Sequence, residues 1–246
     1  MEVKLDLHIH SEHSPDGRMA LDEIVACARA RGLQGVAVCD HDRALTETCN
    51  APDFLLIPGI ELSTDRGHLL GLFVTEQIEA RELDAAIDAV HACGGLAVMA
   101  HPFERSSDAQ RLDAYLDRLD GIEVWNGRAD RKNPQANAMA CALAQRAAKP
   151  VTAGSVSASA SSVTTPLPIS SGRCASLPAV RAALLRGATA VDGRRGKARY
   201  VAESQLTKRR RTHAGAAAYV KWALFAAKCC LQDITWKGET YHVLDR

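Results

Sequence analysis

The feature that most constrains the fold is a regular alternation of short apolar strand patterns with amphipathic helix patterns. Strand patterns cover residues 3–9, 35–39, 54–60, 68–74, 96–100, 121–125 and 150–154. Helix patterns cover residues 21–32, 80–95, 110–119 and 135–147. Alternation of this kind builds a parallel sheet or barrel in which the strand C-termini meet on one face. We therefore expect an α/β protein, with one hairpin turning at residues 65–67.

The second half of the chain departs from this rhythm. Residues 155–171 are low in complexity and predict a flexible loop. A helix near residues 177–186 and a strand near 188–191 resume the pattern. A basic stretch at 194–211, an apolar helix at 214–231 and a terminal hairpin turning at Lys237-Gly238 follow. We expect a barrel domain of residues 1–193, and an extension of residues 194–246 (basic linker, apolar helix and terminal hairpin) packed on it.

Composition narrows the class of protein. The net charge is +1, so no global field attracts nucleic acid. No run of about 20 apolar residues predicts a spanning helix, and the N-terminal sequence MEVKLDLHIH is a charged strand pattern rather than a signal peptide. Eight cysteines without a CxxC pair fit a reducing compartment. We expect a cytoplasmic protein.

Histidines and carboxylates follow the predicted strands at the point where each strand ends. His8 and His10 alternate along the first strand, so both imidazoles point to the same side. His41 stands between Asp40 and Asp42 at the end of the second strand. Because a carboxylate commonly orients a metal-binding imidazole, either aspartate is a candidate partner for His41.

The same pattern recurs further along the chain. Glu61 follows the apolar segment ending in Pro58-Gly59-Ile60, where an unpaired charge would be costly. His68 begins the next strand, and His101 ends the strand at residues 96–100. Asp16 adds a carboxylate in the turn at residues 14–17. Ligands that arrive from separate strands onto one rim are typical of a polynuclear metal site in a barrel.

In chain order, the motifs HIH, SPDG, CDHD, PGIE, GHLLG, AHPF and GIEVWN resemble those of the PHP (polymerase and histidinol phosphatase) family of metal-dependent phosphoesterases. The resemblance covers roughly residues 3–154. It implies a distorted seven-stranded TIM-like (β/α)7 barrel with a C-terminal extension. It also implies a site with two or three Zn, Mn or Fe ions.

The resemblance assigns three metal positions. It places His8, His10 and Glu61 on one ion, Glu61, His68 and His101 on a second ion that Glu61 bridges to the first, and Asp16 and His41 on a third. Glu123 and Asn126 in GIEVWN resemble a pair that supports the rim. Arg128 either meets a phosphate or lies in solvent.

The last motif departs from the family pattern. Members that hydrolyse phosphoesters typically carry Gly-Ser-Asp-x-His after a late strand, whereas residues 154–158 here read Gly-Ser-Val-Ser-Ala. The side chains of Val156 and Ala158 have no atom that can ligate a metal. We therefore expect two divalent ions, with the third position weak or empty.

Three functions stay open from the sequence. The first is hydrolysis of small phosphomonoesters, nucleotides or oligonucleotide ends by metal-bound hydroxide, with His8, His10, Glu61 and His101 as the catalytic set. The second is a catalytically impaired relative that binds metal or phosphate in a regulatory role. The third concerns the tail, which has a partly apolar stripe of Tyr219, Trp222, Ala226 and Cys229-Cys230. This stripe either lies on a membrane surface or packs on the barrel or on a dimer partner.

Overall fold

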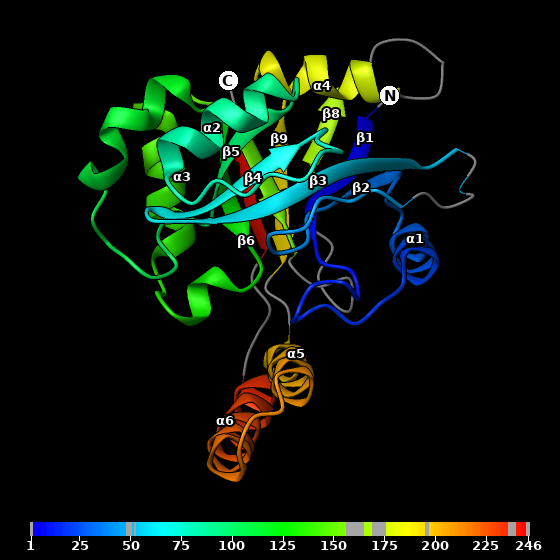
Figure 1. Cartoon of the computed structure of the whole chain (residues 1–246), viewed down its shortest axis with the longest axis vertical. Coiled ribbons are helices and arrows are strands. Elements are labelled where there is room, and N and C mark those ends of the chain that lie inside the picture. Colours follow the sequence, from blue (N-terminus) through cyan, green and yellow to red (C-terminus); the bar gives the residue numbers. More distant parts are fainter. Residues whose placement is uncertain are drawn as a thin grey trace.

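The computed structural model describes residues 2–47, 51, 53–155, 165–168, 176–194, 197–235 and 240–244. Its centre is a sheet that curls into a nearly closed barrel of seven strands, with an eighth strand at one edge (Figure 1). The barrel strands are β1 (Glu2–Ile9), β2 (Gly35–Val38), β3 (Leu55–Thr64), β4 (Gly67–Leu72), β5 (Leu96–Ala100), β6 (Gly121–Asn126) and β7 (Val151–Gly154). The predicted α/β barrel is therefore confirmed.

Helices surround this sheet. They are α1 (Leu21–Ala30), α2 (Leu83–Ala92), the 3-10 helices η1 (Gln110–Arg118) and η2 (Ala129–Arg131), α3 (Ala136–Arg146) and α4 (Leu177–Leu185). Every residue of β2, β5, β6 and β7 is buried, as expected for strands covered on both faces. The helix predicted at residues 110–119 forms, but with 3-10 geometry.

One strand of the barrel runs against the others. β4 pairs antiparallel with both β3 and β5, and Thr64 faces Gly67 across the predicted turn. The remaining barrel neighbours pair in parallel. The start of β4 therefore lies at the same rim as the ends of β3 and β5, where His68 is in register with Ser63 and Ala100.

The barrel closes where β7 returns to β1. The backbone N–H of Ser155 donates to Asp6 Oδ1 of β1 at 3.1 Å. Gly154 lies so close to β1 that a Cβ there would overlap the Cβ of His8 and come within 2.5 Å of Glu123 Oε1. Only glycine permits this approach of the two strands.

The loop predicted over residues 155–171 contains a strand. β8 (Thr165–Pro168) pairs antiparallel with β1, with Thr165 in register with Leu5. Pro166 and Pro168 are tolerated because β8 lies at the edge of the sheet. Residues 156–164 and 169–171 of this segment, including Val156 and Ala158, lie outside the described residues.

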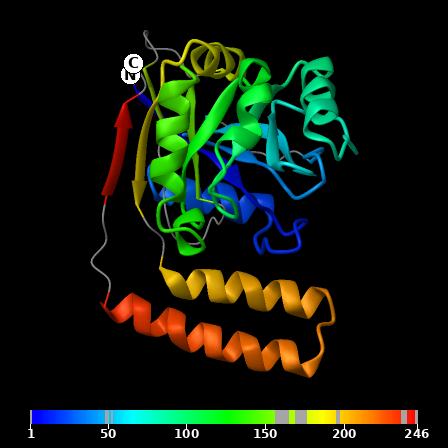
Figure 2. The same ribbon diagram turned by 90° about the vertical axis from the view of Figure 1, so that its left-hand side faces the viewer.

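The basic stretch predicted as a linker is helical instead. Helix α5 (Ala198–Arg211) and helix α6 (Ala216–Thr235) form a helical hairpin that projects from the barrel (Figures 1 and 2). Ala198 and Ala202 of α5 pack with Cys229 of α6, and this small apolar contact explains why the basic segment folds. The Trp222 indole N–H also donates to the Ala202 carbonyl at 2.7 Å.

The turn of the predicted terminal hairpin, Lys237-Gly238, lies outside the described residues, but the segments on either side of it differ from the prediction. Ile234 and Thr235 belong to α6, and β10 (Thr240–Leu244) pairs antiparallel with β9 (Ala190–Arg194) instead of with its own neighbour in sequence. β9 supplies the longer-range partner that a local pattern cannot show. The predicted domain boundary at 193/194 falls within β9 and stays a prediction. No helix in the described part of the chain combines the length and apolarity needed to cross a membrane.

Candidate metal centre

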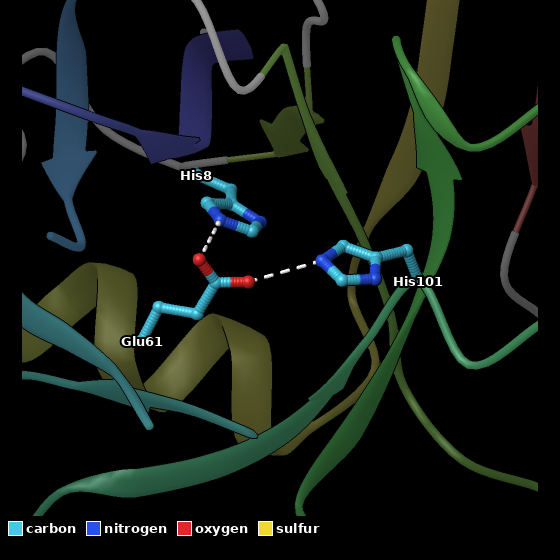
Figure 3. Close-up of side chains that lie close together, drawn as sticks. All are labelled: His8, Glu61 and His101. Atoms are coloured by element: carbon cyan, nitrogen blue, oxygen red, sulfur yellow. Dashed lines mark hydrogen bonds and ion pairs between the residues drawn. The ribbon is translucent and has the colours of Figure 1, made fainter. Parts of the chain in front are cut away.

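The carboxylate of Glu61 is the centre of the barrel rim. It is buried at 1% exposure near the end of β3. Five imidazole nitrogens surround it. Glu61 Oε2 lies 3.5 Å from His8 Nε2, 3.1 Å from His10 Nε2 and 2.9 Å from His41 Nδ1, and Oε1 lies 2.9 Å from His68 Nδ1 and 3.0 Å from His101 Nε2. Figure 3 shows this carboxylate between His8 and His101.

The backbone explains the convergence. His8 and His10 bracket the end of β1, and His41 forms an isolated parallel bridge with Glu61 beyond β2. His68 reaches the rim because β4 is antiparallel. His101 follows β5 with a φ of +26°, a left-handed conformation that a non-glycine residue rarely adopts. Such backbone strain is often found at functional sites.

The donor atoms fit a divalent metal. Among the described residues, Glu61 Oε2 and His68 Nδ1 are buried and find no partner with hydrogen-bond geometry, although imidazole or carboxylate atoms lie close to both. His8 Nε2 and His10 Nε2 face each other at 3.1 Å. Imidazole nitrogens with a buried carboxylate suit Zn, Mn or Fe. The donors form two compact groups, His8 with Glu61 and His101, and His10 with His41 and Glu61, and within each group the donor atoms lie within 4.8 Å of one another.

These two groups divide the ligands differently from the sequence-based assignment. His8 lies close to His10, with which the prediction paired it on one ion, but it also groups with Glu61 and His101. His41 groups with His10 and Glu61, and its Nε2 is 3.9 Å from Asp16 Oδ1. All seven predicted ligands lie at this rim, and their division between ions stays a prediction.

Glu123 holds two of the histidines in place. Its Oε1 lies 3.0 Å from His8 Nδ1, and its Oε2 accepts from the backbone N–H of His101 at 2.8 Å and from Asn126 Nδ2 at 3.1 Å. An imidazole fixed at Nδ1 presents Nε2 to a metal. Asn126 in turn accepts from the backbone N–H groups of Arg128 and Ala129. This arrangement fits the supporting role expected for Glu123 and Asn126.

Asp16 and Arg128 form a second support. Asp16 Oδ1 lies 2.8 Å from His10 Nδ1, and Arg128 Nη1 donates to Asp16 Oδ2 at 2.8 Å. Arg128 is 16% exposed, so it is not a solvated arginine. Although burial opposes it, His10 and Arg128 hold the pKa of Asp16 far below its usual range. Asp16 is thus a carboxylate that fixes His10 and faces His41.

The two aspartates beside His41 form hydrogen bonds with other groups. Asp40 accepts from the backbone N–H and hydroxyl of Ser11, at 2.7 and 2.5 Å. Asp42, with a φ of +54°, accepts from the backbone N–H of Ser63 at 2.8 Å and from Arg81 at 2.5 Å. Asp40 thus contacts the segment after β1, and Asp42 contacts β3 and Arg81. The ring nitrogens of His41 lie near Glu61 and Asp16 instead.

The carboxylates and imidazoles of the centre lie close enough to shift one another's pKa. Burial lowers the pKa of His10, but the carboxylates of Asp16 and Glu61 outweigh it and raise that pKa to about 9. Glu123 and Glu61 likewise raise the pKa of His8 against burial. The imidazoles, His8 and His41 first, lower the pKa of Glu61 although burial opposes them. Metal ions would take the place of these protons.

Sequence reasoning missed Asp6. This carboxylate is buried on β1, and its Oδ1 accepts from the backbone N–H groups of His8 and Ser155. Burial raises its pKa to about 7, and the hydrogen bonds from Ser155 and His8 oppose this only in part. The strand period was the available signal, since Asp6, His8 and His10 alternate onto one face. Asp6 ties the end of β7 to the strand that carries the histidines.

A cleft of about 550 Å³ opens beside the centre. His68 and His101 line it, and so do three arginines and two carboxylates, Arg66, Arg105, Arg111, Asp65 and Glu104. Arg66 and Arg105 pair with Asp65 and Glu104. The Arg111 guanidinium donates to the carbonyls of Arg66 and Pro102, and its Nε is buried without a hydrogen-bond partner. Burial lowers the pKa of Arg111, and no described carboxylate forms an ion pair with it.

Comparisons with known proteins agree with this geometry. A family model described as the PHP domain matches residues 6–126. Two uncharacterized proteins of Methanocaldococcus jannaschii are similar in sequence. One is 30% identical over 140 residues, covering 50% of this chain and 82% of the relative. The other is 31% identical over 148 residues, covering 56% of this chain and 58% of the relative.

Two solved structures share the fold. A two-domain protein of Bacteroides vulgatus, containing a predicted PHP-like metal-dependent phosphoesterase, has a TM-score of 0.57 and 19% identity over 78% of this chain. This chain spans 64% of that protein. A candidate metal-dependent phosphoesterase of Bifidobacterium adolescentis has a TM-score of 0.53 and 21% identity, covering 74% of this chain and 96% of that one. The matched family model and the relative covered over most of its length show that the chain belongs to the PHP domain family.

Proposed function

We propose that this protein is a metal-dependent phosphoesterase that hydrolyses small phosphomonoesters, nucleotides or oligonucleotide ends. One observation carries the proposal: both oxygens of the buried Glu61 lie among imidazole nitrogens, three at Oε2 and two at Oε1. A carboxylate in this position is suited to bridge two divalent ions. Its partners would be His8, His10, His41, His68 and His101, with Asp16 beside them.

Two bound ions would supply Lewis-acid stabilisation of the charge that develops on a phosphoryl group. The protein's own contribution is to hold the ligands rigid. Glu123 fixes His8 through Nδ1, and Asp16 with Ser14 fixes His10 through Nδ1. Both histidines therefore direct Nε2 toward Glu61 without any rearrangement.

The cleft beside the centre supports an anionic substrate of small-molecule size. Its volume of about 550 Å³ lies in the range usual for small-ligand sites. Arg66, Arg105 and Arg111 place guanidinium groups on the walls of the same cleft as His68 and His101. Guanidinium groups bind phosphate in a bidentate manner. Arg111 is the strongest candidate contact, because only backbone carbonyls accept from its terminal nitrogens among the described residues.

A second candidate function is binding without turnover. Val156 and Ala158 stand where the family motif carries aspartate and histidine. Changing a residue that supports a ligand usually lowers metal affinity by about 10–100-fold. Loss of an anionic ligand itself should lower the affinity by at least as much. A weakened site that still holds metal or a phosphorylated ligand would suit a regulatory role.

The first test is phosphate release. Purified protein loaded with Mn²⁺ or Zn²⁺ should hydrolyse 4-nitrophenyl phosphate or a nucleotide, and Glu61→Gln should lower kcat/KM by at least about 1000-fold, since it removes the shared anionic ligand. Glu82→Gln is a matched control at an exposed position before α2. Equal activity of Glu61→Gln and the parent protein would refute the proposal.

The second test separates the two candidate functions. The double substitution Val156→Asp with Ala158→His restores the family motif. A rise in turnover of orders of magnitude, with elemental analysis showing added metal, would identify the parent chain as the impaired form. Unchanged turnover in a parent protein that already holds two ions per chain would favour the phosphoesterase.

A further inference from the structure

Helix α6 exposes large apolar side chains to solvent. Val220 is 63% exposed, Leu224 71%, Leu231 65% and Ile234 80%. Phe225 adds a fifth at 38%, and Leu185 of α4 is the other exposed large apolar side chain in the described part of the chain. Isolated exposed leucines are ordinary, but several on one helix indicate a contact surface.

The exposed side chains follow a helical repeat. Val220, Leu224, Ala227, Leu231 and Ile234 are separated by four, three, four and three residues, which places them on one stripe along α6. We call these five residues the α6 stripe. Helix α5 packs against the opposite side of α6, through Trp222 and Cys229.

The stripe predicted from the sequence, which contains Trp222, Ala226 and Cys229, is therefore the face of α6 that α5 covers. Trp222, Ala226 and Cys229 face α5, where Ala198 and Ala202 bury Cys229. Figure 2 shows α5 between the barrel and α6, so the α6 stripe points away from the rest of the molecule. A helix that is apolar on both faces needs a second partner for the uncovered one.

The charge of the helical hairpin indicates the partner's chemistry. Residues 197–235 contain eight Lys and Arg and two acidic residues, a net charge of +6 in a chain whose total is +1. Lys221 and Lys228 are exposed along one edge of the α6 stripe. The two acidic groups are engaged, Glu203 with Arg18 and Asp233 with the backbone N–H groups at the start of α5.

We propose that α6 lies flat on an anionic lipid surface, with the α6 stripe among the acyl chains and Lys221 and Lys228 at the level of the headgroups. Amphipathic helices bind membranes through buried apolar area together with attraction of lysines to anionic lipid. A second copy fits less well. In an antiparallel pair of α6 helices the lysine-bearing edges would face each other, and like charges repel.

The attachment would fix the orientation of the barrel. Ser204 of α5 donates to the Asp16 carbonyl at 2.9 Å, and Arg211 donates to the carbonyls of Glu12 and Ser14 at 2.7 and 2.6 Å. The helical hairpin is thus joined to the loop that carries Asp16. The proposal rests on the exposed stripe of α6 and the charge of the helical hairpin, and it does not depend on the proposed phosphoesterase activity.

Vesicle flotation of the full chain tests the proposal. The protein should float with vesicles of phosphatidylcholine mixed with phosphatidylglycerol, float much less with phosphatidylcholine alone, and be released by high salt. Leu224→Glu combined with Leu231→Glu should lower vesicle binding at least about tenfold, because two charges enter the face of α6 that would be buried in the lipid. Lys221→Glu with Lys228→Glu should weaken binding to the anionic vesicles only.

Leu185→Glu is the matched control, since it places the same charge at an exposed leucine outside the helical hairpin. It should bind vesicles as the parent protein does, and circular dichroism should show all variants folded. Failure of the parent protein to float with anionic vesicles would overturn the proposal. Equal flotation of the Leu224/Leu231 double variant would also overturn it. A dimer by light scattering that depends on Leu224 and Leu231, without vesicle binding, would assign the stripe to a second copy.

Discussion

The barrel rim and the helical hairpin break the usual rule of burial in opposite directions. At the rim, Glu61, His8 and His10 are charged or polar and at most 3% exposed. On α6, Leu224 and Ile234 are apolar and at least 71% exposed. Buried polar groups and exposed apolar stripes are the informative exceptions in a folded protein. The buried donors of the rim fit the metal ions that we propose for it, whereas the exposed stripe of α6 fits the lipid surface that we propose for that helix.

The rim also contains a carboxylate that costs stability when it is ionised. The pKa of Asp6 is raised by burial from its ordinary value of 3.8 to about 7. A folded-state pKa above the unfolded value means that stability is lost as the pH rises from about 4 to about 7. Asp6→Asn keeps the acceptor for Ser155 and His8 but cannot ionise.

The parent protein should lose stability as Asp6 ionises, whereas Asp6→Asn should not. We therefore expect the free energy of unfolding of Asp6→Asn, relative to that of the parent, to rise by about 2–3 kcal/mol between pH 5 and pH 8. The measurement is denaturant unfolding of metal-free protein at both values. Asp22→Asn, an exposed control on α1, should show no such trend. A stability difference for Asp6→Asn that is independent of pH would contradict this account of the rim.

Strand contact at the barrel closure offers a second test. Gly154→Ala places a Cβ against His8 and Glu123, so the two strands must separate. Overpacking of this kind costs about 1–3 kcal/mol, and denaturant unfolding measures it. Gly94→Ala is an unsuitable control because Gly94 has a φ of +71°. Ala153→Gly, one residue earlier on β7, gives a comparison in which volume is removed. A Gly154→Ala protein as stable as the parent would show that the closure is looser than described.

Glu123→Gln tests how tightly the centre is pre-organised. Loss of the charged partner of His8 should weaken metal affinity by about 10–100-fold, or about 1.4–2.7 kcal/mol, with the fold retained. Isothermal titration with Zn²⁺ or Mn²⁺ gives the affinity, and Glu82→Gln again serves as control. Unchanged affinity would mean that His8 is held by the strand alone.

The smallest effect should come from the hairpin. Leu224→Ala should change the free energy of unfolding by no more than about 0.5 kcal/mol in the absence of lipid. Leu69→Ala, at a fully buried leucine of β4, should cost about 2–5 kcal/mol. Equal costs for the two truncations would show that α6 is covered in solution and would erase the contrast between the regions.

Much of the site could be read from residue order. Alternating strands and helices predict a barrel, and strand C-termini in a parallel barrel meet at one rim. This pattern predicts Glu61 at the rim together with four histidines, His8, His10, His68 and His101. All four imidazoles lie around the carboxylate of Glu61. The sequence can predict these positions because the alternation of side chains along a strand, and the residue at which the strand ends, are local properties of the chain.

Contacts between distant segments could not be read in this way. The pairing of β10 with β9, the strand hidden in the low-complexity segment and the roles of Asp40 and Asp42 depend on which elements become neighbours. Both faces of α6 are apolar, so its sequence could not tell which one α5 covers. By itself the sequence determined the barrel, its rim and which histidines and carboxylates gather there. Only the tertiary structure decided their mutual distances and the exposed stripe, since packing choices depend on the whole set of surfaces that folding brings together.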